Sequence, residues 1–124
     1  MEDKIIKRKF TTLEIDKFIE LSEDNAFFHS SSKFAKSKGF KDRICHGVMT
    51  LMPVSKILGE ILPGNGYVIA ELNTKFFKPI LAGEEVNYRY STKIKNDDIG
   101  YIKVEIIAST LLGEKYFFTS AVCK

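Results

Sequence analysis

The sequence predicts an α+β fold in which an antiparallel sheet wraps around one long apolar helix. Residues 46–66 are apolar over almost the whole circumference of a helix, and a helix of that kind is normally buried. After Gly66 the chain consists of runs with the period-two alternation of strands, separated by short turns. A sheet that curves around the helix covers it most economically, which gives the predicted architecture.

Size and composition predict one domain. The chain has 124 residues, of which 44% are apolar, enough for one hydrophobic core, so we expect a single domain over residues 1–124. The charged first ten residues lack an apolar run of signal-peptide length, and no segment approaches the roughly 20 apolar residues that span a bilayer. The net charge of +3 comes from scattered residues, which disfavours nucleic-acid binding. We therefore expect a soluble, cytoplasmic protein that binds neither membranes nor nucleic acids.

The N-terminal part is expected to contribute a strand and a helix. Residues 4–10 are typical of a short strand or extended arm. Thr11 or Thr12 can cap the following helix, whose apolar residues recur with helical period and which ends near Ser22.

The next segment is expected to be a loop followed by a brief helix. Residues 23–29 show no clear period, which is typical of a loop. Ser31 or Ser32 can cap the brief helix, and Gly39 is expected to end it.

The long apolar helix has one awkward residue and a clear end. Pro53 removes a backbone hydrogen bond, so we expect it to kink the helix. The run Pro63-Gly64-Asn65-Gly66 stops the helix.

The remaining half of the chain is expected to be an antiparallel meander. Branched and aromatic residues alternate with polar ones, and glycine, asparagine and aspartate mark the turns. The expected strands span residues 67–80, 86–95, 101–110 and 115–123. Such a sheet has edges to cover, and dimerisation is the usual way to cover them.

The two cysteines predict neither a disulfide framework nor a metal site. Cys45 and Cys123 are too few for a framework, and Cys45-His46 lacks the further ligands that a zinc site needs. A nucleophilic Cys45 with His46 as its base is disfavoured, because adjacent side chains seldom point toward each other. We expect no metal.

The residues best suited to chemistry lie just before the long helix. Asp24 and His29 share one irregular segment, where a carboxylate and an imidazole can converge on one water. The N–H of Gly47 is expected at the mouth of the helix, where it can bind a developing negative charge on a carbonyl oxygen. From spacing alone the pattern also fits an ordinary turn and helix start.

Residues 18–29 read FIELSEDNAFFH, and residues 43–50 read RICHGVMT. Together these two blocks resemble the MaoC-like family of (R)-specific enoyl-CoA hydratases, whose pattern runs roughly Ser-Gly-Asp-x-Asn-Pro-x-His and then Ile-x-His-Gly-Met. Residues 58–86 resemble the helix exit, first long strand and Gly-Glu turn of the family. The matching positions are Ser22, Asp24, His29, Ile44, His46 and Gly47.

The resemblance implies a single hotdog fold and a set of site residues. Asp24 and His29 would be the catalytic pair that holds the water, and the Gly47 amide would bind the thioester oxygen. Ser55 would hydrogen-bond near the pair, and His46 would support it. The implied reaction is hydration of an enoyl thioester, or the reverse dehydration, in fatty acid metabolism. The substrate would be an acyl-CoA or acyl-carrier-protein thioester, with no cofactor beyond coenzyme A itself. The protein would be a homodimer or higher oligomer with the acyl pocket at the shared interface.

The chain departs from the family pattern inside the first block. Glu23, Ala26 and Phe27 stand where the family has Gly, Asn and Pro. These departures keep open a non-catalytic hotdog subunit that binds acyl thioesters; a hotdog thioesterase is the other alternative. A basic stretch could meet the phosphates of coenzyme A or an acidic carrier protein, or form an ordinary solvated face. It contains Lys33, Lys36, Lys38, Lys41 and Arg43.

Overall fold

The computed structural model describes residues 4–124, so the first three residues of the expected domain lie outside the described part. One strand precedes the helices and the other four strands follow them, which confirms the predicted α+β class. In chain order the elements are β1 (Lys4–Lys9), α1 (Thr12–Ser22), α2 (Phe27–Ser30), α3 (Ser32–Ser37), η1 (Met49–Leu51), α4 (Met52–Lys56), η2 (Ile57–Ile61), β2 (Ile69–Phe76), β3 (Glu85–Asn96), β4 (Tyr101–Ser109) and β5 (Lys115–Cys123).

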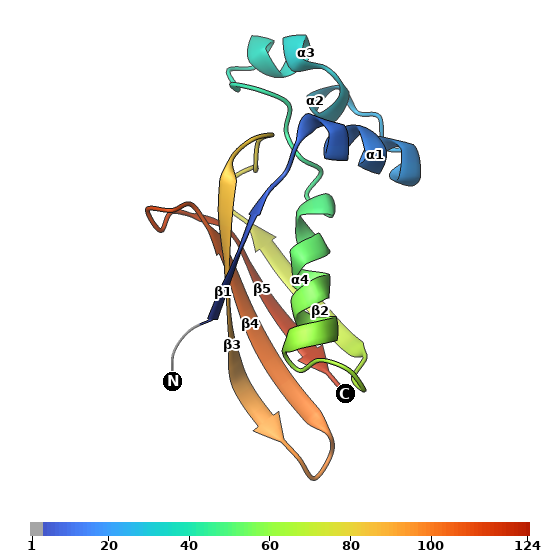
Figure 1. Cartoon of the computed structure of the whole chain (residues 1–124), viewed down its shortest axis with the longest axis vertical. Helices are drawn as coiled ribbons and strands as arrows, with labels where there is room; N and C mark the ends of the chain where they lie inside the picture. The colour runs from blue at the N-terminus through green and yellow to red at the C-terminus, as the bar shows by residue number, and fades with distance from the viewer. Residues whose placement is uncertain (1–3) are drawn as a thin grey trace.

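The sheet is antiparallel, with strand order β1-β3-β4-β5-β2. β3, β4 and β5 form the expected meander. The prediction is wrong for the first strand after the helix, because β1 occupies the outer side of β3 and β2 pairs with β5 instead, so β1 and β2 form the two edges. The central helix lies along one face of the sheet, and α1, α2 and α3 gather beyond one end of it (Figure 1). This is the hotdog arrangement that the resemblance implies.

The helix α1 begins at a complete capping box. The Glu14 N–H donates to the Thr11 hydroxyl at 3.1 Å, and the Thr11 N–H donates to the Glu14 carboxylate at 3.0 Å. These bonds satisfy backbone donors that a helix start leaves free. The predicted start at Thr11 or Thr12 and end at Ser22 are confirmed.

Two short helices follow α1. The prediction of a loop over residues 23–29 is wrong at its end, because α2 begins at Phe27. Only one turn forms, so no periodic pattern can mark it in the sequence. The Ser31 hydroxyl accepts the Phe34 N–H at 3.0 Å and caps α3, and Gly39 follows its end with φ of +92°, as predicted.

The central helix is a continuous run of three types of turn. A 3₁₀ turn, η1, leads into α4, and a π turn, η2, ends at Ile61. Pro53 is the second residue of α4, where the first-turn N–H groups have no partner within the α-helix. The lost hydrogen bond that the sequence predicts is therefore accommodated by a change of helix type at this point, from a 3₁₀ turn to an α-helix.

Only one side of the central helix is buried. Val54, Ile57 and Leu58 face the core, whereas Val48 and Met52 are 64% and 40% exposed. The prediction of burial around the whole circumference is therefore wrong for the single chain. Its apolar outer side is left for some other surface to cover.

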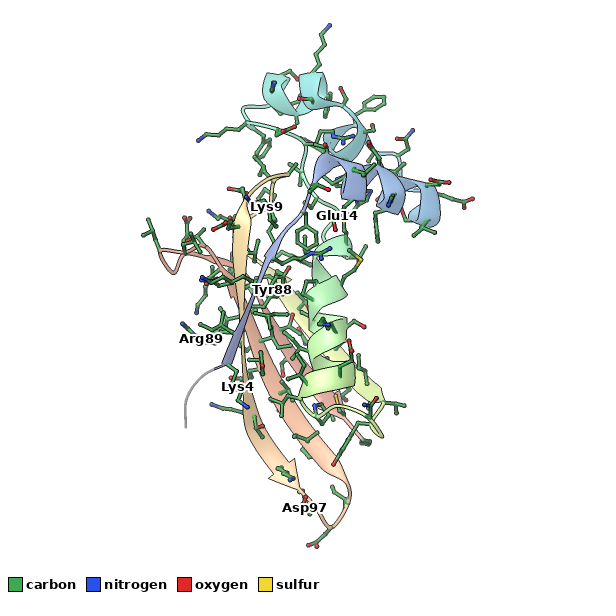
Figure 2. The ribbon with its side chains drawn as sticks, viewed as in Figure 1. Lys4, Lys9, Glu14, Tyr88, Arg89 and Asp97 are labelled. Carbon is green, nitrogen blue, oxygen red and sulfur yellow. The ribbon has the colours of Figure 1, made fainter. Side chains whose placement is uncertain are left out.

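One buried hydrogen bond joins the sheet to the start of the helix. The Tyr88 hydroxyl on β3 donates to the Thr50 carbonyl at 2.8 Å, and Tyr88 lies between sheet and helix (Figure 2). Phe117 of β5 packs against the Tyr88 ring. Within residues 4–124, none of the helices is long and apolar enough to cross a membrane.

Candidate active site

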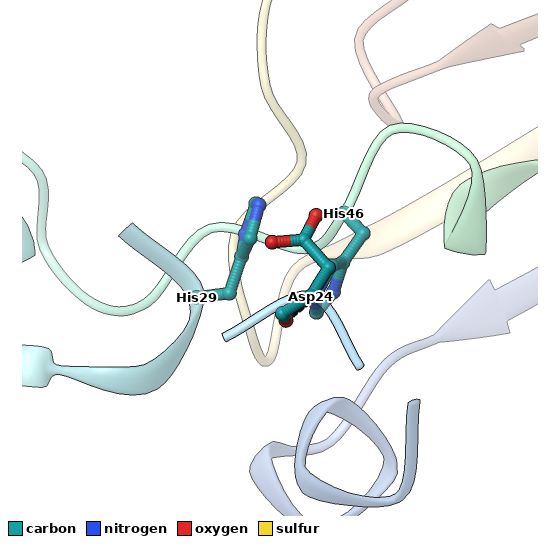
Figure 3. Close-up of side chains that lie close together, drawn as sticks. All are labelled: Asp24, His29 and His46. Carbon is teal, nitrogen blue, oxygen red and sulfur yellow. Dashed lines mark hydrogen bonds between the residues drawn. The ribbon is translucent and has the colours of Figure 1, made fainter. Parts of the chain in front are cut away.

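Three side chains converge beyond the start of the central helix. They are Asp24 in the turn after α1, His29 in α2, and His46 just before η1 (Figure 3). One oxygen or ring nitrogen from each lies within 4.8 Å of the others. The structure thus brings together residues that are 22 positions apart in the chain.

The turn that carries Asp24 is held by its own polar side chains. The Asp24 N–H donates to the Ser22 hydroxyl, and the Ala26 N–H donates to Asp24 Oδ1, both at 3.1 Å. A side chain that bonds its own backbone in this way fixes a tight turn without help from glycine. Within the described residues no hydrogen bond engages Asp24 Oδ2, so this oxygen is free to accept one from a bound molecule.

The proton on His29 can be placed from its partner. Nδ1 lies 2.6 Å from the Ile44 carbonyl oxygen. A carbonyl only accepts, so Nδ1 carries the proton and Nε2 of the neutral ring is an acceptor. Because His29 lines a cavity, this nitrogen is suited to accept a hydrogen bond from a water or substrate there.

His46 is a buried ring packed on two others. It is 1% exposed and stacks on His29 with 3.8 Å between ring centroids and 23° between planes. Phe18 of α1 lies 4.7 Å away, and Nε2–H donates to the Asp24 carbonyl at 2.9 Å. Burial lowers the pKa of His46, and His29 adds to this effect, whereas the bond to the Asp24 carbonyl opposes it.

An apolar cavity of about 380 Å³ opens beside His29 and Gly47. Within residues 4–124 the Gly47 N–H has no hydrogen-bond acceptor, so it can donate to a ligand. The other lining residues are Ile44, Cys45, Thr50, Phe76, Phe77, Lys78, Pro79, Ile80 and Phe117. Phe76, Phe77 and Lys78 were not among the predicted site residues. Their one signal in the sequence is the pair of consecutive aromatic residues, which breaks the alternation of a strand.

Ser55 does not join this group within the chain. It lies in α4 on the exposed side of the central helix, and it makes no hydrogen bond to Asp24, His29 or His46. The support expected from Ser55 is therefore not seen in the single chain.

Cys45 and Arg43 are engaged within the structure, whereas the lysines of the basic stretch face solvent. Burial raises the pKa of Cys45 to about 12, which keeps its thiol protonated and poorly nucleophilic. The lysines of the basic stretch are all exposed, and Lys38 lies over the Phe34 ring. Arg43 instead binds Asp16 at 2.7 Å and thereby ties α1 to the segment before the central helix.

The three converging side chains are poorly arranged to share a metal ion. The lone pair of an imidazole nitrogen lies in the plane of its ring. His29 and His46 are stacked with nearly parallel planes, so their lone pairs do not point at a common position. In each ring, one nitrogen also donates a hydrogen bond to a backbone carbonyl and is therefore not available as a metal ligand.

Comparison with known proteins identifies the family. The profile of the MaoC-like domain matches residues 3–111. The chain belongs to the MaoC-like family. The match contains all the converging residues and the whole central helix.

Several proteins that are similar to this chain are named hydratases or dehydratases. An (R)-specific enoyl-CoA hydratase of Aeromonas caviae is 29% identical over 93 residues, which cover 75% of the chain and 69% of the relative. A 3-hydroxybutyryl-CoA dehydratase of Methylorubrum extorquens is 31% identical over 86 residues, 69% of the chain but only 55% of that relative. The solved structure of an (R)-hydratase from A. caviae matches with a TM-score of 0.91 and 26% identity, over 99% of the chain and 93% of that structure. The hotdog fold is therefore confirmed.

Proposed function

We propose that this MaoC-like protein is an (R)-specific enoyl-thioester hydratase, which also catalyses the reverse dehydration of 3-hydroxyacyl thioesters. The observation that carries the proposal is the arrangement of Asp24, His29 and Gly47 around one site. His29, with its acceptor ring nitrogen, and Gly47, with its free backbone N–H, line one apolar cavity, and the Asp24 carboxylate lies within 4.8 Å of a His29 ring nitrogen. The names of the relatives support the reaction class and its stereochemistry.

The chemistry follows from these three groups. Asp24 and His29 hold a water whose oxygen bonds to C3 of the enoyl chain while C2 gains a proton. The pair first takes a proton from the water and then delivers a proton to C2, so the hydrogen that C2 gains is balanced by the one that the water loses. The Gly47 N–H binds the thioester oxygen, on which negative charge develops. The C2–C3 double bond becomes a single bond and no electrons are transferred, so the reaction needs no redox cofactor.

The substrate is an acyl thioester of coenzyme A or of a carrier protein, and the protein acts in the cytoplasm. The apolar cavity suits the acyl chain, since burial of apolar surface is what binds a hydrocarbon. Coenzyme A enters only as part of the substrate.

The protein acts as a homodimer. The edge strand β2 and the outer side of the central helix leave large apolar side chains exposed, including Val48, Met52, Ile69, Leu72 and Phe76. An unpaired apolar edge of this kind is covered when a second copy pairs with it. Phe76 also lines the cavity, so the proposed interface adjoins the proposed site.

The test is the loss of enoyl absorbance when purified protein meets crotonyl-CoA and then longer enoyl-CoAs. We expect turnover, and we expect Asp24→Asn and His29→Ala to reduce kcat by at least about 100-fold. Asp97→Asn is the matched control, because Asp97 lies in the exposed β3–β4 turn, at the far end of the sheet from α1–α3 (Figure 2).

Other outcomes would contradict the proposal. Release of free thiol without hydration would indicate a thioesterase. A flat trace with every enoyl-CoA and with an enoyl-carrier protein, from folded protein, would indicate a binding role.

A further inference from the structure

His46 lies at a junction of three chain segments, two of which carry the proposed catalytic pair. Phe18 comes from α1, Asp24 from the following turn, and His29 from α2. The His46 ring contacts all three and is 1% exposed, so it cannot itself meet a substrate.

Its hydrogen bond fixes one tautomer. The Asp24 carbonyl only accepts, so Nε2 of His46 must carry the proton. Nδ1 is buried and has no partner within residues 4–124. A second proton on this ring would therefore be a buried donor without an acceptor, which is costly.

The stack on His29 also opposes protonation of His46. A charged His46 would lie 3.8 Å from the ring that exchanges protons in the proposed reaction. The titratable groups that act on His46 from neighbouring segments are His29 in α2 and Asp24 in the turn. The surroundings of His46 therefore keep its ring neutral next to His29, the ring that takes part in proton transfer in the proposed reaction.

We propose that His46 is the positioning residue of the site. Its Nε2–H holds the backbone of Asp24, and its uncharged ring is the flat surface against which His29 is oriented. The kinetic consequences rest on the proposed hydratase function; the tautomer and the contacts do not. The chain has only two histidines, so the NMR signals of their ring nitrogens can be assigned and used as a direct probe of both rings.

The first experiment is nitrogen NMR of the two imidazoles in the unmodified protein without substrate. We expect His29 as the Nδ1–H tautomer and His46 as the Nε2–H tautomer, with His46 remaining neutral at pH values where free histidine is protonated. A His46 that carries its proton on Nδ1, exchanges between tautomers, or titrates like free histidine would overturn the proposal. This result stands whether or not the protein turns over any substrate.

Two variants separate the two roles of His46. His46→Gln can place an amide N–H near the position of Nε2 but removes the ring, so His29 is expected to become a mixture of tautomers. His46→Phe keeps a flat ring but leaves the Asp24 carbonyl without its donor, so His29 is expected to keep its tautomer. In both we expect kcat to fall about 10- to 100-fold with KM changed less than about threefold, because small misplacements of reacting groups carry penalties of this size.

A purely structural role predicts a different pattern. Phe18→Leu is the matched control, since it removes packing against His46 and touches neither the Asp24 carbonyl nor the Ile44 carbonyl. We expect it to lower the unfolding temperature while kcat and the His29 tautomer stay unchanged. Folded His46 variants that behave like this control would overturn the positioning role. If the variants do not fold, the spectrum of the unmodified protein decides.

Discussion

Phe76 lies directly against Gly47. A Cβ atom built on Gly47 would stand 3.3 Å from Cζ of the Phe76 ring, closer than an ordinary van der Waals contact. Phe76 comes from the edge strand β2, and Gly47 precedes the central helix, so the contact joins two walls of the cavity. Glycine keeps the backbone N–H accessible there, because no side chain fills the gap.

Gly47→Ala keeps the backbone N–H but obstructs access to it, so we expect kcat/KM for enoyl-CoA to fall by about 100-fold, as when an oxyanion donor no longer reaches its acceptor. The added methyl must push Phe76 aside or enter the cavity. Phe76 is 49% exposed and can yield, so we expect the protein to remain folded. Steady-state kinetics and circular dichroism check this. Gly59→Ala is the control, as its Cβ would meet nothing within 4 Å; equal losses in both variants would contradict the role of Gly47.

Stability should fall at mildly acidic pH because of His46. Its pKa is lowered from 6.5 in the folded protein, whereas the unfolded chain has the ordinary value. Below about pH 6.5 the His46 ring binds a proton in the unfolded state but stays neutral in the folded state. The free energy of unfolding therefore decreases as the pH falls toward the pKa of the folded protein. Urea unfolding at pH 8 and pH 5 measures this change. His46→Phe should show a smaller change, and an identical one would refute the assignment.

At alkaline pH the buried thiol of Cys45 should destabilise the protein. Its pKa is raised from 9.0 to about 12, so the folded state keeps the proton that the unfolded state loses above pH 9. The contribution to stability is complete below pH 9 and is lost as the pH rises toward 12. Buried Tyr88 and Tyr116 act in the same direction. We expect Cys45→Ala to reduce the slope of stability against pH between about 9 and 11, measured by urea unfolding; an unchanged slope would contradict this.

A charge on the edge strand should separate the proposed dimer. Leu72→Lys replaces an apolar side chain of β2, which is 44% exposed in the single chain, with one that carries a positive charge. We expect light scattering to show dimer for the parent protein and monomer for the variant, since an unpaired charge opposes burial of the edge. Leu112→Lys is the control, because Leu112 is 99% exposed in the β4–β5 turn and should leave the dimer intact. A monomeric parent protein would refute the dimer outright.

The capping box of α1 should contribute measurably to stability. Thr11→Ala removes the hydroxyl that accepts the Glu14 N–H, and loss of such a cap costs about 1 kcal/mol. Thermal or urea unfolding measures the change. Thr12→Ala serves as the matched control, since the neighbouring threonine makes no capping bond with its side chain. Equal effects of the two substitutions would mean that the cap is not the cause.

The sequence by itself determined the elements whose causes are local. The cap at Thr11, the turn at Gly39 and the alternation of the strands act between residues a few positions apart. The proximity of Asp24 and His29 also follows from their short separation in the chain. The class of fold and the two blocks that resemble the family were therefore visible without a structure.

Only the tertiary structure decided the surroundings of these residues. The burial of His46 between Phe18 and His29 depends on how α1 and α2 pack before the central helix. The contact of Phe76 with Gly47 joins residues 29 positions apart, and the exposed position of Ser55 depends on which side of the helix meets the sheet. Residue spacing along the chain carries no information about such contacts, because they are set by the packing of whole elements against one another.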